Sequence, residues 1–260
     1  GIMKKTVALA LACLMSVSLL AGCQQPEQVS IASPEDLKGH TVGVQAGTTG
    51  ETYCNESVEG IDVKSYKSGL EAAMDLKNGQ IDAVVLDELP AKEIVKQNPE
   101  LKIIDKELTT EDYAIAVKKG NQELLDSINE TLARIKEDGT YDELVKAFMP
   151  ADGNIVLPEM DLGTNTEVLK MGTNAAFPPF EYIDSTEPVG FDICVANEIA
   201  KDYGKKLEVV DMNFDSLITA LNAGQIDFVA AGMSATEERK QAVDFSDPYF
   251  SATQVIIVRK

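Results

Sequence analysis

Tryptophan is absent from this 260-residue chain, and histidine occurs once, as His40. A single histidine excludes histidine-rich metal clusters and argues against a Ser-His-Asp triad. No Cys/His spacing suggests a metal, and we expect neither a metal nor a cofactor. Basic residues are also few, because 23 Lys and Arg stand against 43 Asp and Glu, a net charge of −20. Such an acidic surface repels nucleic acid and anionic lipid head groups, so neither is an expected partner.

Cysteine is rare as well, with four residues in the chain. Cys13 lies in an N-terminal apolar stretch and Cys23 ends that stretch, which leaves Cys54 and Cys194 for the folded part. The sequence does not indicate that the Cα atoms of these two come within disulfide reach. We expect two free, half-buried thiols.

The N-terminus has the features of an export signal. Two lysines precede an apolar stretch from Thr6 to Leu20, and Leu20-Ala21-Gly22-Cys23 matches the bacterial lipobox, whose cysteine is lipidated. The stretch is short and has no basic stop-transfer flank, which argues against a transmembrane helix. We predict a signal peptide over residues 1–23 and lipidation at Cys23. The protein is then exported and anchored at the outer face of the cytoplasmic membrane, or periplasmic.

Helix and strand signals alternate along the rest of the chain. A helix start at 33–37 (Ser at the N-cap, then Pro and acidic residues) is followed by a strand at 40–44 and a Gly-rich turn at 45–50. Another helix at 68–78 then precedes a buried strand at 81–86. This alternation predicts an α/β fold with helices on both faces of a parallel sheet.

One short pattern occurs twice. Gly79-Gln80-Ile81-Asp82 and Gly224-Gln225-Ile226-Asp227 each follow an apolar helical stretch and precede a strand. Glycine after a helix is common, so one copy would carry little weight. Two copies within the same alternation predict two similar α/β lobes. Between them, residues 151–166 are rich in turn formers and have little periodicity, which predicts a linker.

Six stretches, spread over nearly all of the chain after residue 30, resemble the polar amino-acid-binding proteins of bacterial ABC importers (solute-binding protein family 3). They are residues 42–49, 137–141, 172–182, 189–193, 231–239 and 243–250. The resemblance implies a two-lobe periplasmic-binding-protein type II fold. Each lobe would be a mostly parallel sheet flanked by helices, with the ligand cleft between the lobes.

The order of these stretches differs from that of the family. Family members usually begin with the stretch that starts here at Val168, and end with the one that ends here at Pro150. We therefore predict a circular permutation in which residues 151–166 join the family's original ends. Such a linker reaches up to roughly 50 Å when extended.

The predicted boundaries follow from these signals. They are 1–23 for the signal peptide with its lipobox, 24–32 for a tether, 33–109 for the smaller lobe, 110–150 for a crossover strand and C-terminal helices of the larger lobe, 151–166 for the linker, and 167–260 for the larger lobe. Residues 112–117 are predicted to form a single strand. Since Lys260 would lie in the family's first crossover between the lobes, only the segment near 111–113 is expected to join the lobes covalently.

The resemblance also implies which residues bind a ligand. Arg239 is the expected partner of an amino acid's carboxylate, because a guanidinium binds both oxygens at once. Ser234 and the backbone N–H of Thr49 would add donors to the same carboxylate. Asp87 follows a buried strand, where ligands of open α/β sheets bind, and is the expected ammonium partner.

The remaining predicted contacts concern the ligand's side chain. Phe177 and Phe214 would sandwich it, although Phe214 is also plausible as core, and Asn174 and Gln45 point toward its far end. Ala231 and Gly232 belong to the same motif as Arg239 and complete the set. Relatives that bind lysine or histidine often have Asp in place of Asn174, which argues against a purely cationic preference. Arginine, glutamine and cystine all stay open.

The predicted function is capture of a polar L-amino acid and its delivery to the permease subunits of an ABC importer. We expect a monomer that touches the membrane through its lipid anchor only and catalyses nothing. An exported cyclohexadienyl-dehydratase-like enzyme is the alternative on the same fold. It would need a free carboxylic acid in the cleft, where Asp87 is the one acid predicted. A sensor ectodomain would carry a transmembrane helix after the domain.

Overall fold

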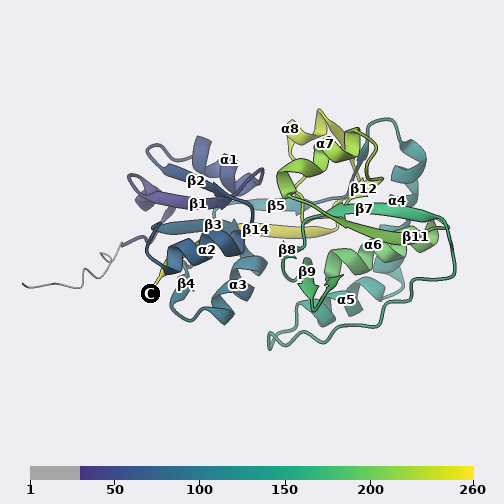
Figure 1. The fold of residues 1–260 in the computed structure, drawn as a ribbon, viewed down its shortest axis with the longest axis horizontal. Coiled ribbons are helices and arrows are strands. Elements are labelled where there is room, and N and C mark those ends of the chain that lie inside the picture. The colour runs from purple at the N-terminus through teal and green to yellow at the C-terminus, as the bar shows by residue number, and fades with distance from the viewer. Residues whose placement is uncertain (1–29) are drawn as a thin grey trace, which may run out of the picture.

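The computed structural model describes residues 30–260. The predicted signal peptide, Cys23 and residues 24–29 of the tether lie outside the described residues. In the described part, two lobes lie side by side and are joined by strands that cross between them (Figure 1). Among residues 30–260, none of the helices has the length and apolar character needed to span a membrane.

The smaller lobe is a sheet with helices on its faces. Its elements are η1 (Pro34–Leu37), β1 (Thr41–Gln45), α1 (Thr49–Glu56), β2 (Asp62–Tyr66), α2 (Gly69–Lys77), β3 (Ala83–Asp87), α3 (Glu88–Gln97) and β4 (Leu101–Ile103). The strand order is β2-β1-β3-β14-β4, and β1 is parallel to both β2 and β3. All five residues of β3 are buried, as expected for a strand at the centre of a covered sheet.

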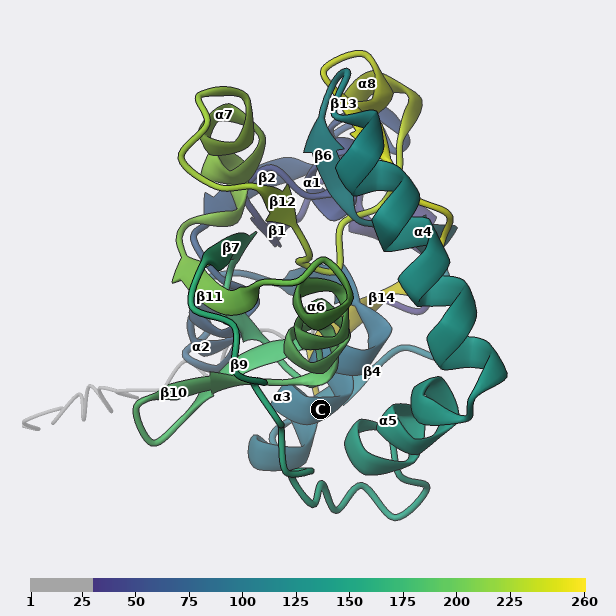
Figure 2. The same ribbon diagram turned by 90° about the vertical axis from the view of Figure 1, so that its right-hand side faces the viewer.

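The larger lobe has a five-stranded sheet of order β11-β7-β12-β6-β13. Its elements are β6 (Ala116–Lys118), α4 (Gln122–Glu137), α5 (Thr140–Phe148), β7 (Val168–Thr173), β8 (Ala176–Phe177), β9 (Glu181–Asp184), β10 (Glu187–Val189), α6 (Phe191–Asp202), β11 (Lys206–Asp211), η2 (Phe214–Ser216), α7 (Leu217–Asn222), β12 (Phe228–Val229), α8 (Glu237–Lys240) and β13 (Val243–Phe245). Helices α6 and α7 cover opposite faces of this sheet (Figure 2).

Two strands cross between the lobes, β5 (Thr110–Tyr113) and β14 (Phe250–Arg259). They pair antiparallel from Phe250 opposite Tyr113 to Thr253 opposite Thr110. The prediction of one strand over 112–117 is wrong, because the chain leaves β5 at Tyr113 and starts β6 in the other sheet. Between these strands, the N–H of Ala114 donates to a larger-lobe carbonyl and the N–H of Ile115 to a serine hydroxyl, so the larger lobe satisfies this bend.

The assignment of all of 167–260 to the larger lobe is wrong for the end of β14. Residues 254–257 pair with β3, and residues 257–259 pair with β4, both in the smaller lobe. The apolar run Val255–Val258 has no polar member and is buried throughout. Such a run needs cover on both faces, which the centre of the smaller-lobe sheet provides. Both β5 and β14 therefore connect the lobes covalently.

The two-lobe α/β fold with mostly parallel sheets is confirmed, because one strand in each five-strand order runs against the other four. Strands β2, β1 and β3 run parallel in one lobe, as do β11, β7 and β12 in the other. The reversed strand is β14 in the smaller lobe and β6 in the larger lobe, and β4 and β13, which pair with them, run with the parallel strands. Both reversed strands depend on the crossing segments, because β14 is itself a crossing strand and β6 directly follows the crossing strand β5.

The predicted repeat has one packing arrangement in both lobes. A Cβ placed on Gly43 of β1 would lie 2.7 Å from Cδ1 of Ile81, and a Cβ placed on Gly172 of β7 would lie 2.2 Å from Cδ1 of Ile226. Each isoleucine thus packs into the space that a glycine leaves on the neighbouring strand. Both isoleucines are almost fully buried. The repeat predicted from sequence is a repeat in structure.

Cys54 and Cys194 are both free, as expected, although Cys54 is fully buried. Burial raises the pKa of each thiol to about 12. A thiol with so high a pKa is a poor nucleophile at neutral pH. These cysteines therefore act as small apolar residues of the core.

Candidate ligand-binding cleft

The structure brings most of the predicted site residues to one narrow cavity between the lobes. Its lining is Gln45, Thr48, Thr49 and Asp87 from the smaller lobe, with Phe177, Phe214, Gly232, Ser234 and Arg239 from the larger lobe. All but Thr48 were predicted. Asn174 lies beside this lining and accepts a hydrogen bond from the side chain of Gln45. Ala231 is a buried core residue next to Gly232.

Arg239 spans the interface from helix α8. Its Nη1 donates to the carbonyl of Ser234 in its own lobe, and its Nη2 donates to the carbonyl of Gly47 in the other lobe, each at 2.8 Å. The guanidinium lies over the ring of Phe214, 5.5 Å from its centroid. Burial lowers the pKa of Arg239, and nearby carboxylates oppose that shift, so the group stays charged. The larger lobe thus presents a fixed cation to the cleft.

Asp87 presents the opposite charge at the end of β3. The hydroxyl of Tyr113 donates to one of its oxygens, and the side-chain amide of Gln254 donates to the other. Burial raises the pKa of Asp87 to about 7; Glu111 acts in the same direction, while the two hydrogen bonds and Arg239 oppose it. A ligand cation beside Asp87 would favour its ionised form.

Gln45 and Asn174 form a neutral contact across the two lobes. Gln45 donates from Nε2 to Oδ1 of Asn174 at 2.9 Å, and Asn174 donates from Nδ2 to the carbonyl of Met212 at 2.8 Å. Both side chains are largely buried. Their amides supply donors and acceptors without net charge, so this part of the interface does not select by charge alone.

Gly232 allows the backbone to lie against an aromatic wall of the cavity. Its φ is +54°, and a Cβ there would lie 2.6 Å from Cε2 of Phe177. The N–H of Gly232 donates to Oδ2 of the buried Asp192 at 2.8 Å, and this hydrogen bond holds the backbone at Gly232 in place. An L side chain at this position would be strained and would clash with the ring.

The structure adds cleft residues that were not predicted, chief among them Glu111 on β5. Its Oε2 accepts from the hydroxyl of Thr49 at 2.7 Å and from the hydroxyl of Ser234 at 2.5 Å. Gln254 is a second, and its sequence signal was visible: one polar residue beside the apolar run at 255–258. Glu111 had no such signal, because its partners are distant in the sequence.

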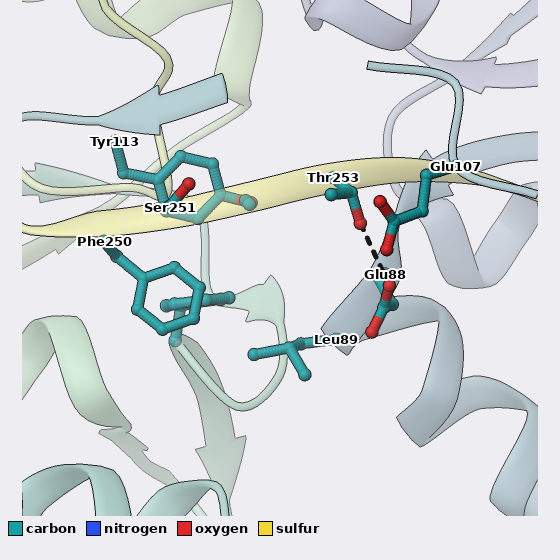
Figure 3. Close-up of a pocket in the computed structure, with 9 residues that line it drawn as sticks. Glu88, Leu89, Glu107, Tyr113, Phe250, Ser251 and Thr253 are labelled. Carbon is teal, nitrogen blue, oxygen red and sulfur yellow. Dashed lines mark hydrogen bonds between the residues drawn. The ribbon is translucent and has the colours of Figure 1, made fainter. Parts of the chain in front are cut away.

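A second cavity, of about 190 Å³, lies at the crossing strands (Figure 3). Glu88, Leu89 and Glu107 line it from the smaller lobe, and the ring of Phe250 faces it from the other side. The hydroxyl of Thr253 donates to Glu88 at 2.9 Å. This cavity shares none of the predicted ligand contacts.

The structure thus places the half-buried guanidinium of Arg239 and the buried carboxylate of Asp87 on opposite lobes, at one cavity between them. The sequence matches the family of bacterial extracellular solute-binding proteins, family 3, over residues 25–151 and 169–260. The chain belongs to this family.

Curated relatives match parts of the chain. It is 50% identical over 92 residues to the arginine-binding extracellular protein ArtP of Bacillus subtilis, covering 35% of this chain and 36% of that protein. It is 35% identical over 124 residues to the L-cystine-binding protein TcyJ of Escherichia coli, covering 47% of each. The chain thus spans about a third to a half of the length of the curated relatives that it matches.

A solved structure of an ancestral arginine-binding protein bound to arginine is 53% identical, over 34% of this chain and 39% of that chain, with a TM-score of 0.32. The curated relatives include arginine-, cystine- and histidine-binding proteins, and some carry the name of an ABC transporter component.

Proposed function

We propose that this protein captures a polar L-amino acid between its lobes and delivers it unchanged to the permease subunits of an ABC importer. The observation that carries the proposal is the placement of Arg239 and Asp87 on opposite lobes of one buried cleft. A free amino acid carries a carboxylate and an ammonium, and burying either is costly unless it is paired and hydrogen-bonded. The cleft supplies one partner for each.

Arg239 would exchange its two carbonyl acceptors for the two oxygens of the ligand's carboxylate. The first N–H groups of α1, beginning at Thr49, would add donors, because a helix N-terminus leaves these groups without intrahelical acceptors. Asp87 would take the ammonium. Phe177 and Phe214 would pack against the ligand's side chain, near the amides of Gln45.

Among arginine, glutamine and cystine, we propose arginine first. Two carboxylates, Glu111 and Asp87, lie close enough to Arg239 to oppose the lowering of its pKa by burial, so acids outnumber bases around the cleft. That imbalance favours a ligand with a net positive charge. The names of the matched relatives point the same way, without deciding the ligand of this chain.

A thermal-shift screen over the twenty amino acids plus cystine and ornithine tests the proposal, because a ligand that binds only the folded state raises Tm. Arginine should give the largest rise, and calorimetric titration should then show one site per chain. Arg239→Ala is the control that should abolish the shift. An absence of any shift with every amino acid would contradict the proposal.

We also propose lipid anchoring at Cys23, which rests on the lipobox, and the circular permutation, which rests on the order of the family stretches. For the anchor, Cys23→Ala should release the protein from the membrane fraction of a bacterial host and end its labelling by radioactive palmitate. Retention and labelling of that variant would refute the anchor. For the permutation, a chain that joins Lys260 to Ile31 and opens within 151–166 should fold and bind the same ligand.

The dehydratase alternative deserves a test because Glu111 is a second acid near the cleft. Sequence reasoning counted only Asp87. Glu111 accepts hydrogen bonds from Thr49 and Ser234, as a carboxylate does, which favours the binding function. Incubation with prephenate and spectroscopic detection of aromatic product decides the matter, and turnover that is lost in Glu111→Gln would favour the enzyme.

A further inference from the structure

Glu111 joins the two lobes at the cleft through hydroxyl groups. Thr49 begins α1 of the smaller lobe, Ser234 belongs to the larger lobe, and both donate to the same oxygen of Glu111, at 2.7 and 2.5 Å. The other oxygen accepts from the hydroxyl of Thr109 at 3.3 Å. Glu111 itself lies on β5, one of the two strands that cross between the lobes.

Counting protons fixes the direction of these hydrogen bonds. A carboxylate has no proton to give, and a hydroxyl has only one, so Thr49 and Ser234 each use theirs on Glu111. The hydroxyl of Thr49 also accepts from Nε2 of Gln254 at 3.2 Å, so it acts as a donor to Glu111 and as an acceptor from Gln254. Ser234 lines the cavity and keeps free lone pairs there, but no free proton.

We infer that Glu111 is a positioning residue that makes the Ser234 hydroxyl an acceptor for the ligand's ammonium group. The inference rests on the proposed function and revises the predicted role of Ser234 as a donor to the carboxylate. An ammonium has three protons and needs several acceptors. The cleft offers two acceptors, the carboxylate of Asp87 and the hydroxyl of Ser234. Tyr113 connects them, because its hydroxyl donates to Asp87 and its backbone forms a β-bridge with Ser234.

This arrangement makes the cleft select for the amino group itself. A ligand without an ammonium would leave the buried charge of Asp87 without a cation and the remaining lone pairs of Ser234 without a donor, which is costly. A carboxylate cannot take the place of the ammonium, because Ser234 has no proton to offer it. Glu111 therefore acts on specificity without touching the ligand.

Glu111→Gln tests the inference, because it keeps the shape and adds two N–H donors. The amide can donate to Ser234 and release the serine proton toward the cavity. Binding of arginine should weaken at least tenfold, while binding of 5-guanidinopentanoic acid, which lacks the amino group, should change less than threefold. Ser234→Ala should reduce the preference for arginine over 5-guanidinopentanoic acid in the same way. The double variant should lose little more arginine affinity than either single variant.

Glu107→Gln is the matched control. It removes one negative charge from the segment before β5, yet its side chain lines the second cavity and not the cleft (Figure 3). It should leave the preference for arginine over the des-amino acid unchanged, and unfolding of all variants should be checked by circular dichroism.

Equal losses for the two ligands in Glu111→Gln would overturn the inference, since a purely structural role moves both. An identical effect of Glu107→Gln would overturn it too, because general charge would then be the cause. Failure of the proposed function is distinguishable: the unaltered protein itself would then bind no amino acid.

Discussion

The two lobes share one scaffold and bring different chemistry to the cleft. In the smaller lobe the N–H of Asp82 donates to the carbonyl of Thr41, and in the larger lobe the N–H of Asp227 donates to the carbonyl of Lys170, both at 2.9 Å. Beyond this shared start, the two strands lead to unlike ends. Five residues after each aspartate, the smaller lobe has Asp87, whereas the larger lobe has a glycine.

That difference shows where the function is encoded. Asp87 and Gly232 occupy equivalent places in the repeat, and both line the cleft. One offers a carboxylate, and the other offers bare backbone that lets Phe177 come close. Only the larger lobe carries Arg239. The common scaffold thus fixes the position of the strand ends, and the residues at those ends decide what binds.

The largest expected effect comes from removing the one charge that the larger lobe contributes. Arg239→Ala should weaken amino-acid binding by about 2–5 kcal/mol, because the ligand's carboxylate stays buried without its partner. Asp87→Asn, on the other lobe, should weaken the binding of arginine strongly and the binding of 5-guanidinopentanoic acid, which lacks the amino group, much less. Calorimetric titration measures both ligands. Equal losses in Asp87→Asn would show that Asp87 does not hold the ammonium.

Next in size is a matched pair of core truncations. Ile81→Ala and Ile226→Ala should each lower the free energy of unfolding by about 3 kcal/mol, since each removes the same buried side chain from the same packing unit. Urea denaturation followed by circular dichroism measures both. A large difference between the two would mean that the lobes share a pattern but not its energetics.

The pH dependence should separate the lobes, because Asp87 titrates near neutrality and Arg239 does not. With a pKa of about 7, well above its ordinary value of 3.8, Asp87 is protonated at lower pH and cannot pair with an ammonium. Affinity should fall about tenfold per pH unit below 7. In ligand-free protein the sign reverses: this group destabilises the fold as pH rises from about 4 to 7. Asp87→Asn should remove both slopes, and a slope that persists in that variant would assign the titration elsewhere.

The smallest effect concerns the neutral contact between Gln45 and Asn174. Asn174→Asp places a carboxylate at the interface, which should shift the preference toward cationic ligands by about tenfold, the size of a modest charge interaction. Competition between arginine and glutamine measures the ratio, and Gln45→Ala controls for the loss of the hydrogen bond alone. An unchanged ratio would place the ligand's side chain away from Asn174.

Sequence reasoning found the elements whose signals are local. The strand predicted over 40–44 is β1, and the helix predicted over 68–78 is α2 with its N-cap at Ser68. Eight of the ten predicted contacts line one cavity, because a family motif carries its residues together. The single strand predicted over 112–117 is wrong, since nothing in its composition marks the point where the chain changes sheets.

By itself, the sequence determined the two α/β lobes, the repeat and the residue types that could pair with a zwitterion, because hydrophobic period and motif spacing are properties of neighbouring residues. Only the tertiary structure decided that the end of β14 lies between β3 and β4 of the other lobe. It alone placed Glu111 against Thr49 and Ser234, which are 62 and 123 residues away. Contacts of that range depend on how the two lobes close on each other, and no local pattern encodes that closure.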